Sequence, residues 1–182
     1  IVCRTEHEMN EELRSKIGNV PQNAFLFSES IEDNIRLGKK DANDSEIIAA
    51  SKNAVVHDNI LDFKEGYKTL LGERGVTLSG GQIQRVSIAR ALIKDPEILL
   101  FDDCLSAIDT DTEEKILKNL NVFCKNKTSI IVSNRVSSVK EAHHIIVLDK
   151  GRIIEEGNHE KLLKNKGTYA ELFNKQQDEK TF

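Results

Sequence analysis

The chain has 182 residues, which is enough for one domain with its own hydrophobic core. Hydrophobic residues make up 38% and charged residues 31% of it, a balance that excludes an intrinsically disordered chain. The formal net charge is -4, aromatic residues make up 5%, and there is no tryptophan. We therefore expect neither an electrostatic nor a base-stacking surface for nucleic acid.

The sequence also argues against a membrane span and against metal or redox motifs. Apolar runs such as residues 98–101 and 145–148 are four residues long, whereas a membrane helix needs about 20. The three cysteines are isolated and form no C-x-x-C pair, which is typical of a protein in a reducing compartment. The sequence opens with Ile1 and its single methionine is Met9, so we expect the natural chain to begin further upstream.

The first half of the chain predicts a short strand followed by a group of helices. Residues 16–27 favour a strand that runs into a loop. Residues 30–33 have the S-x-x-D form of a helix start, and this helix is expected to end at Gly38. Two further helices are expected over residues 44–54 and 59–63.

The second half alternates apolar strands with helices. A helix over residues 79–93 precedes a buried strand at 97–101, and the next helix begins with the T-x-x-E pattern of Thr110 and Glu113. The later expected elements are a strand at 128–132, a helix at 136–142, a hairpin of 145–148 and 152–155, and two amphipathic helices. This alternation predicts an α/β fold with a parallel sheet covered by helices on both faces.

The strongest functional pattern is the sequence LSGGQ at residues 78–82. Ser79 can cap the following helix, with Gln82 at capping-box spacing. Gly80 and Gly81 remove side chains from the first turn, so backbone N–H groups can approach an anion closely. An ordinary glycine-containing helix start is the alternative, but two glycines lower the stability of a helix, and this favours a phosphate site.

An acidic pair at the end of a buried strand is the second pattern. Asp102 and Asp103 directly follow the apolar residues 98–101. In open α/β sheets ligands bind at the carboxyl edge, and Asp102 could hold Mg²⁺ through water. Taken alone, the pair is also compatible with a strand that ends in solvent.

Together, these motifs and their order resemble the ATP-binding domain of ABC transporters, in the pattern of the exporter subgroup. The residues at family positions are Gln22 of the Q-loop; Leu78, Ser79, Gly80, Gly81 and Gln82 of the signature motif; Asp102 of the Walker B strand; Asp103 where the family has its catalytic glutamate; Asp109 of the D-loop; and Asn134 where it has the switch histidine. The resemblance extends from about Leu13 to the end of the chain.

The resemblance implies a fold and a division of the chain. We expect the parallel-sheet core of a P-loop NTPase (RecA-like), incomplete at its N-terminus, with an inserted small α-helical subdomain. Residues 29–75 would form the subdomain, with the signature helix 79–93 adjoining it. Residues 1–28 and 94–182 would form the catalytic core, so that residues 1–182 make a partial ABC domain.

The resemblance also implies the ligands and partners. ATP and Mg²⁺ are the expected cofactors, with Asp102 and Gln22 near the metal. Two ABC domains would associate head to tail, so that residues 78–82 and Asp109 contact the partner's ATP. A transmembrane domain outside this chain would hold it at the cytoplasmic face of the cell (inner) membrane.

Three departures from the family pattern limit the expected activity. The G-x-x-x-x-G-K-[ST] loop is absent from the sequence and would precede Ile1, so the chain alone is not expected to hydrolyse ATP. Asp103 is shorter than glutamate by about 1.5 Å, and a base must reach its water. Asn134 can donate a hydrogen bond but cannot become cationic as histidine can. This pattern is similar to the degenerate half of a heterodimeric exporter.

Three other functions remain open from the sequence. A degenerate domain could act as a non-catalytic, ATP-dependent clamp, or the chain could be an inactive fragment. A chromosome-maintenance ATPase head would also carry an LSGGQ-like helix. Such heads are interrupted by a long coiled coil, whereas the region between Gln22 and Leu78 has no sustained heptads.

Overall fold

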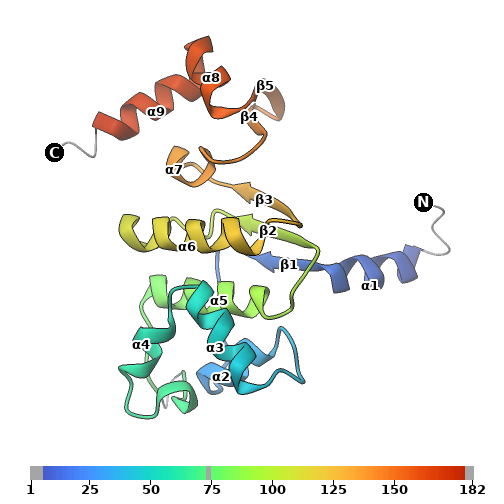
Figure 1. Ribbon diagram of the computed structural model, residues 1–182, viewed down its shortest axis with the longest axis vertical. Coiled ribbons are helices and arrows are strands. Elements are labelled where there is room, and N and C mark those ends of the chain that lie inside the picture. The colour runs from blue at the N-terminus through green and yellow to red at the C-terminus, as the bar shows by residue number, and fades with distance from the viewer. Residues whose placement is uncertain (1–5, 73–74, 179–182) are drawn as a thin grey trace. The chain divides into compact units, whose positions relative to one another are not determined.

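The computed structural model describes residues 6–72 and 75–178 of the chain (Figure 1). It divides into two compact units between Val132 and Ser133. The first unit contains a three-stranded parallel sheet, and the second contains a two-stranded antiparallel hairpin. Within the described ranges, every helix is too short or too polar to cross a bilayer.

The sheet of the first unit is built around its middle strand. Its order is β1-β2-β3, with β1 at Ile17–Val20, β2 at Ile98–Asp102 and β3 at Thr128–Val132. Phe101 of β2 is in register with Val20 on one side and Ile131 on the other. All three strands lie where the sequence predicts them, and their carboxyl ends meet at one edge of the sheet.

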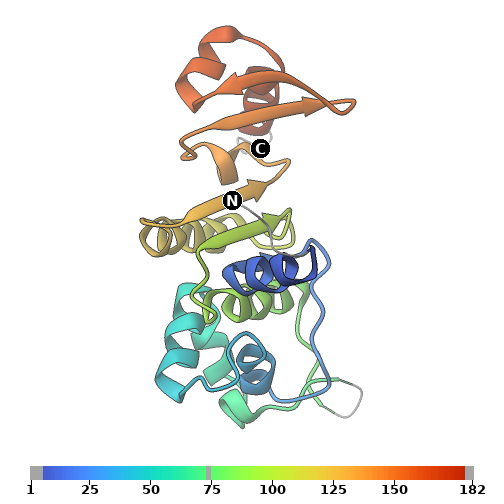
Figure 2. The same cartoon turned by 90° about the vertical axis from the view of Figure 1, so that its right-hand side faces the viewer.

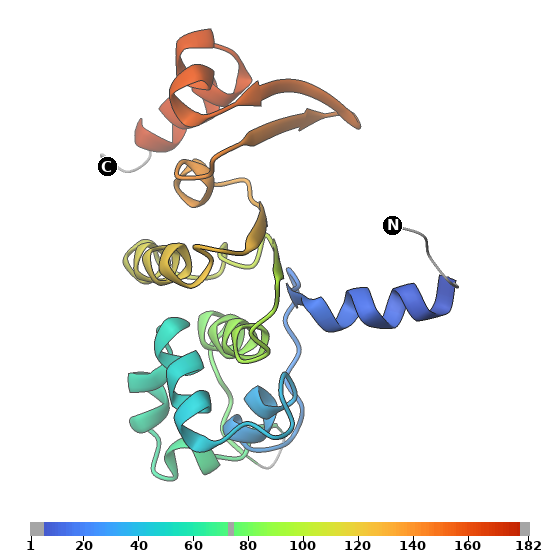
Figure 3. The same cartoon turned by 45° about the vertical axis from the view of Figure 1, so that its right-hand side comes forward.

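The two faces of this sheet differ in burial. Val20, Leu99 and Phe101 are at most 1% exposed. They share the face that carries α5 (Gly80–Leu92) and α6 (Thr110–Phe123), and both helices lie on one side of the sheet in Figure 3. Ile130 and Val132 alternate to the other face and are 50% and 51% exposed. In the described part of this unit, helices therefore cover one face of the sheet at β3, whereas the sequence predicts helices on both.

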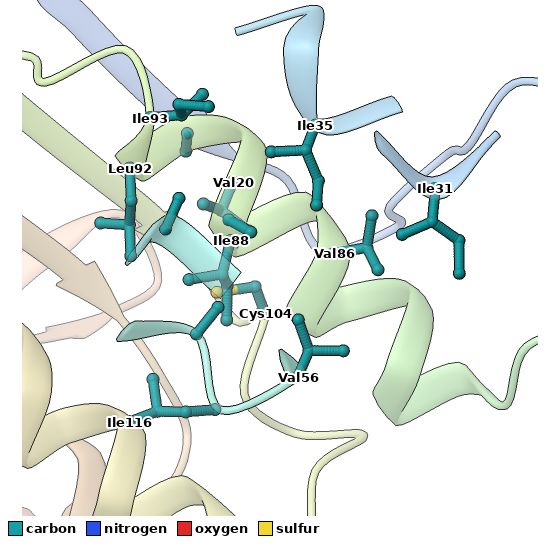
Figure 4. Close-up of a cluster of buried hydrophobic side chains, with 14 of the residues drawn as sticks. Val20, Ile31, Ile35, Val56, Val86, Ile88, Leu92, Ile93, Cys104 and Ile116 are labelled. Carbon is teal, nitrogen blue, oxygen red and sulfur yellow. The ribbon is translucent and has the colours of Figure 1, made fainter. Parts of the chain in front are cut away.

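Helix α5 lies at the centre of the main hydrophobic core. Val86, Ile88 and Leu92 of this helix are each at most 2% exposed. Figure 4 shows them among Ile31 and Ile35 of the neighbouring helix. A helix buried on several sides is expected to carry apolar residues around most of its circumference, as this one does.

The remaining helices of the first unit pack around α5 or precede the sheet. They are α1 (Glu6–Lys16), α2 (Ile31–Arg36), α3 (Asp44–Asn53) and α4 (His57–Leu61), followed by a 3-10 turn at Gly66–Lys68. Helices α2 and α3 contact α5 directly, and α4 contacts α3. The expected helices in this region are present.

The cap of α6 lies one residue earlier than the sequence predicts. The side chain of Asp109 accepts a hydrogen bond from the backbone N–H of Thr112 at 2.9 Å. The T-x-x-E pattern suggested Thr110 as the cap. Aspartate is the stronger N-cap of the two residue types, which explains the shift.

The described residues of the second unit, 133–178, form a hairpin and three helices. Its elements are α7 (Val136–Val139), β4 (Ile145–Asp149), β5 (Arg152–Gly157), α8 (His159–Asn165) and α9 (Thr168–Asp178). Figure 2 shows the hairpin with α8 following it. Lys150 and Gly151 turn the hairpin, both at positive φ, as the primed turns of two-residue loops require. Helix α7 is shorter than the expected 136–142.

Candidate functional site

The LSGGQ sequence begins α5 with a complete capping box. The hydroxyl of Ser79 accepts a hydrogen bond from the backbone N–H of Gln82 at 3.3 Å. In return, the side-chain oxygen of Gln82 accepts from the backbone N–H of Ser79 at 2.9 Å. This arrangement confirms the predicted helix start and fixes the direction of the first turn.

The two glycines of this turn have different surroundings. A Cβ atom on Gly81 would lie 3.1 Å from the carbonyl oxygen of Ala107, so the loop before α6 packs closely against this position. A Cβ atom on Gly80 would have no neighbour within 4 Å. The fold of the described residues therefore explains Gly81 but not Gly80. At Gly80, the missing side chain leaves backbone accessible at the positive end of a helix dipole.

The carboxyl edge of β2 ends in the predicted acidic pair. Asp102 is the last residue of the strand and is exposed. Asp103 follows in the left-handed region with φ of 43°, which aspartate tolerates better than most residues. Its backbone N–H donates to Val132 at 2.8 Å, and its carbonyl accepts from the hydroxyl of Ser106 at 2.9 Å. Asp103 is thus held by both neighbouring segments.

Gln22 and Asp103 are brought together across 81 positions of sequence. The side-chain amide of Gln22 donates to a carboxylate oxygen of Asp103 at 3.3 Å. The amide oxygen of Gln22 and the carboxylate of Asp102 are oxygen ligands of the kind that Mg²⁺ prefers. No group of three or more His, Cys, Asp or Glu side chains with metal-site geometry occurs in the described ranges. The oxygen atoms of Gln22 and Asp102 are chemically compatible with Mg²⁺.

Asp109 ends the loop before α6 and interacts electrostatically with Arg85 of α5. Hydrogen bonds from the backbone and side chain of Thr112 hold the pKa of Asp109 below its usual range, and the positive charge of Arg85 acts in the same direction. The carboxylate is therefore ionised at neutral pH. It follows directly on the Ala107–Ile108 segment that lies against Gly81.

Hydrogen bonds of Arg85 connect the first turn of α5 to α4 and to the residue two positions before it, a role that the sequence analysis did not identify. Its Nε donates to the carbonyl of Gly81 at 3.2 Å, and Nη1 donates to the side chain of Asn59 at 2.7 Å and to the carbonyl of Val55. Val55 has φ of 54°, which is rare for a β-branched residue. Burial lowers the pKa of the Arg85 guanidinium. Because these hydrogen bonds join residues up to 30 positions apart, no local sequence pattern predicts them.

A second network anchors the far end of α5 to the loop after Gln22. Asn34 is 0% exposed. Its amide donates to the carbonyls of Phe27 and Ser30, and its oxygen accepts from the backbone of Phe27 and from Arg90. Arg90 also donates to the carbonyl of Phe25 at 2.9 Å. Every polar group of the buried amide is satisfied, so this loop has a defined backbone conformation.

The anchored loop presents aromatic side chains to solvent. Phe25 and Phe27 are 66% and 48% exposed, and their rings meet edge to face at 5.1 Å. Beside them lies a hollow of about 510 Å³, lined by Phe27, Ser28, Glu29, Asp33, Arg36, Leu37 and Lys40. Two exposed aromatic residues on a rigid loop indicate a contact surface. The signal in the sequence was the apolar triplet of Phe25, Leu26 and Phe27.

Asn134 belongs to the second unit, whereas the other candidate residues lie in the first. Its backbone carbonyl accepts from the side-chain amide of Gln176 in α9 at 2.7 Å. The oxygen of the same Gln176 side chain accepts from the backbone of Val136 at 2.9 Å. The segment before α7 is therefore fixed to the last helix of its own unit.

Comparison with known proteins agrees with this architecture. The sequence profile of the ABC transporter family matches residues 2–106, more than half of the chain. This chain belongs to the ABC transporter family. The resemblance inferred from the LSGGQ helix and the acidic strand is confirmed.

The similar proteins within the ABC transporter family include an exporter of solved structure. The chain is 51% identical over 165 residues to ATP-binding cassette sub-family B member 6 of Rattus norvegicus, covering 91% of this chain and 20% of that protein. It is 49% identical over 164 residues to heavy metal tolerance factor 1 of Caenorhabditis elegans, covering 90% and 20%. The structure of a bacterial Atm1-family ABC exporter with ATP bound superposes with a TM-score of 0.87 at 44% identity, over 92% of this chain and 30% of that one.

These matches confirm the predicted fold class and the exporter-type ATP-binding domain. The mixed α/β fold is that of the ATP-binding domain of an Atm1-family exporter. The chain spans about a fifth of the length of the curated relatives it matches. The roles of individual residues stay predictions, because the matches concern the domain as a whole.

Proposed function

We propose that this chain is the ATP-binding and ATP-hydrolysing part of an ABC exporter, and that its signature end serves the ATP of a partner domain. The observation that carries the proposal is the open position of Gly80 in a capped first turn. A bare helix N-terminus with no packing reason for its glycine suits a phosphate supplied from outside the chain. Leu78, Ser79, Gly81 and Gln82 would complete that surface, with Asp109 beside it.

The chain's own nucleotide site would lie at the carboxyl edge of the sheet. Asp102 and Gln22 would hold Mg²⁺, which, when bound, neutralises phosphate charge. Gln22 would orient the attacking water, and Asp103 would accept its proton as the general base. The hydrogen bond between Gln22 and Asp103 supports this pairing.

We further propose that this own site is the degenerate one of a heterodimer. Asp103 has a shorter reach than glutamate, and a misplacement of about 1 Å can cost about 100-fold in rate. Asn134 would offer an amide to the phosphate in place of a cation. The site would hold ATP and turn it over slowly, while the partner's site uses the intact signature motif of this chain.

The partners would be a second ABC domain and a transmembrane domain, with no nucleic acid. We assign the exposed Phe25–Phe27 loop and its hollow to a cytosolic segment of the transmembrane domain, and place the protein at the cytoplasmic face of the cell membrane. The relatives are several times longer than this chain, which leaves room for such a domain. Residues 29–75 would act as the helical subdomain between this surface and the core.

The test is ATP hydrolysis by the full-length protein, measured alone and with a co-purified second ABC domain. We expect the protein alone to turn over ATP well below the ordinary range of about 1–100 per second, and the pair to reach that range. If the full-length homodimer reaches it alone, the degenerate-site assignment is wrong. If neither assembly binds ATP, the enzymatic function is wrong.

An ATP-dependent clamp without hydrolysis is the second candidate. It is favoured by Asp103 and Asn134, both of which we expect to weaken hydrolysis without removing nucleotide binding. The two functions differ in the pair assay, because a clamp would bind ATP and dimerise with no turnover at either site.

A further inference from the structure

Gln84 is a buried amide on the helix that carries the signature motif. It is 6% exposed and lies four residues after Gly80, about 6 Å further along the axis of α5. Its neighbours on the helix are mostly apolar and belong to the main core. A buried amide on such a helix calls for a specific partner.

That partner is the backbone of the Q-loop. The side-chain nitrogen of Gln84 donates a hydrogen bond to the carbonyl oxygen of Gln22, 62 positions earlier in the chain. Gln22 lies just beyond Val20, the last residue of β1 that pairs with β2. The ladder therefore no longer fixes the backbone at Gln22, and Gln84 does so instead.

A second hydrogen bond of Gln22 extends this connection to the carboxyl edge of the sheet. The backbone of Gln22 is held by Gln84, and the side chain of Gln22 donates to Asp103. The three residues come from α5, from the end of β1 and from the end of β2. A change in the position of α5 would thus reach Asp103 through two consecutive hydrogen bonds.

The side-chain oxygen of Gln84 shows that the hydrogen bond to Gln22 sets the orientation of the amide. Its oxygen is buried and has no hydrogen-bond partner. Reversing the amide would put that oxygen against the carbonyl of Gln22, two acceptors facing each other. The donor orientation therefore leaves one polar atom unsatisfied in order to keep the bond to Gln22.

We infer that Gln84 is a positioning residue that sets the Q-loop of this chain's own ATP site from the helix whose N-terminus serves the partner's ATP. The inference rests on the proposed function. It makes α5 a direct physical connection between the two sites to which one chain contributes. Gln84 touches neither nucleotide and acts through the backbone of Gln22.

The first test is a double-substitution cycle in the full-length protein under single-turnover conditions, following the site that contains Gln22 and Asp103. Gln84→Met keeps the length of the side chain and removes the donor. We expect it to lower the single-turnover hydrolysis rate about 10-fold while the affinity for ATP, measured separately by equilibrium binding, changes little. In a Gln22→Ala background the same substitution should have almost no further effect, because it acts through Gln22.

The control is Ser87→Ala, which removes another buried polar group, 4% exposed, from the same helix. It should leave the hydrolysis rate unchanged. If the effects of Gln84→Met and Gln22→Ala simply multiply, the positioning inference is overturned and the proposed function stands. If Gln22→Ala itself leaves the rate unchanged, both the inference and the role of Gln22 in the proposed function are overturned.

A second variant covers the case in which Gln84→Met does not fold. Gln84→Asn keeps a buried amide but shortens the side chain by about 1.5 Å, so the donor no longer reaches the carbonyl of Gln22. We expect the same loss of hydrolysis rate, again with almost no further effect in a Gln22→Ala background. A Gln84→Asn variant that keeps the parent's rate, or whose effect multiplies with that of Gln22→Ala, overturns the inference.

Discussion

The signature end of α5 and the carboxyl edge of the sheet, which we propose serve two different ATP sites, are built differently. At the signature end, Ser79 and Gln82 stabilise each other within one turn. At the sheet edge, Gln22 and Asp103 meet across 81 positions. The signature end keeps every residue of the family motif, whereas the sheet edge carries the substitution at Asp103. We expect a change at Asp103 to alter the reach of the carboxylate without disturbing the helix that we propose serves the partner.

The largest effect is expected for Gly80→Ala. A Cβ atom there meets nothing within 4 Å, and alanine is the better helix former by about 1 kcal/mol, so the free energy of unfolding should not fall. The rate at the partner's site should fall about 100-fold or more, because phosphate contacts are displaced. Measuring thermal unfolding and ATP turnover in parallel separates the effect on stability from the effect on activity.

Gly81→Ala is the matched comparison for this change. Its Cβ atom would press on the carbonyl of Ala107 at 3.1 Å, so this variant should lose stability as well as activity. Full activity in Gly80→Ala would contradict the assignment of the signature end to a nucleotide.

The next effect tests the sheet edge. Asp103→Glu should raise turnover at the chain's own site about 10- to 100-fold, because the carboxylate reaches about 1.5 Å further. Asp103→Asn has the same size without the base and should abolish that turnover. Single-turnover hydrolysis by the full-length protein provides the measurement. An unchanged rate in Asp103→Glu would mean that reach does not limit this site.

The smallest effect is expected for Asn134→His. The histidine would be cationic below a pKa near 6.5. A cation stabilises phosphate charge in the transition state. The hydrolysis rate of Asn134→His should therefore rise a few-fold as pH falls through that value, whereas the rate of the unsubstituted protein should not change over the same range. A pH–rate profile of the two proteins decides this. A dependence already present in the parent would assign the titration to another group.

The sequence predicted the features that depend on neighbouring residues. The capping box at Ser79 and Gln82, the buried strand before Asp102 and the hairpin turn at Gly151 each depend on residues within a few positions. Such signals are readable because the chemistry is local. Gln22 has no such local signal, and its place near Asp102 and Asp103 was predicted from the resemblance to the ABC family.

The contacts that connect these features could not be predicted. Gln84 meets Gln22 across 62 positions, and Arg90 meets Asn34 across 56. Each side chain has an ordinary helical sequence environment, and only packing determines its partner. The same holds for the uncovered face of the sheet at Ile130, where alternation along the strand gives no sign of what lies opposite.

The anchoring of Asn34 by Arg90 gives the molecule a mechanical property. The loop of Phe25 and Phe27 cannot shift alone, because its carbonyls and amide are bonded to a buried side chain and to α5. Arg90 and Gly80 stand about 15 Å apart on one continuous helix. We therefore expect a force on the exposed rings of Phe25 and Phe27 to move α5 as a rigid unit, so that Gly80 at its N-terminus is displaced with it.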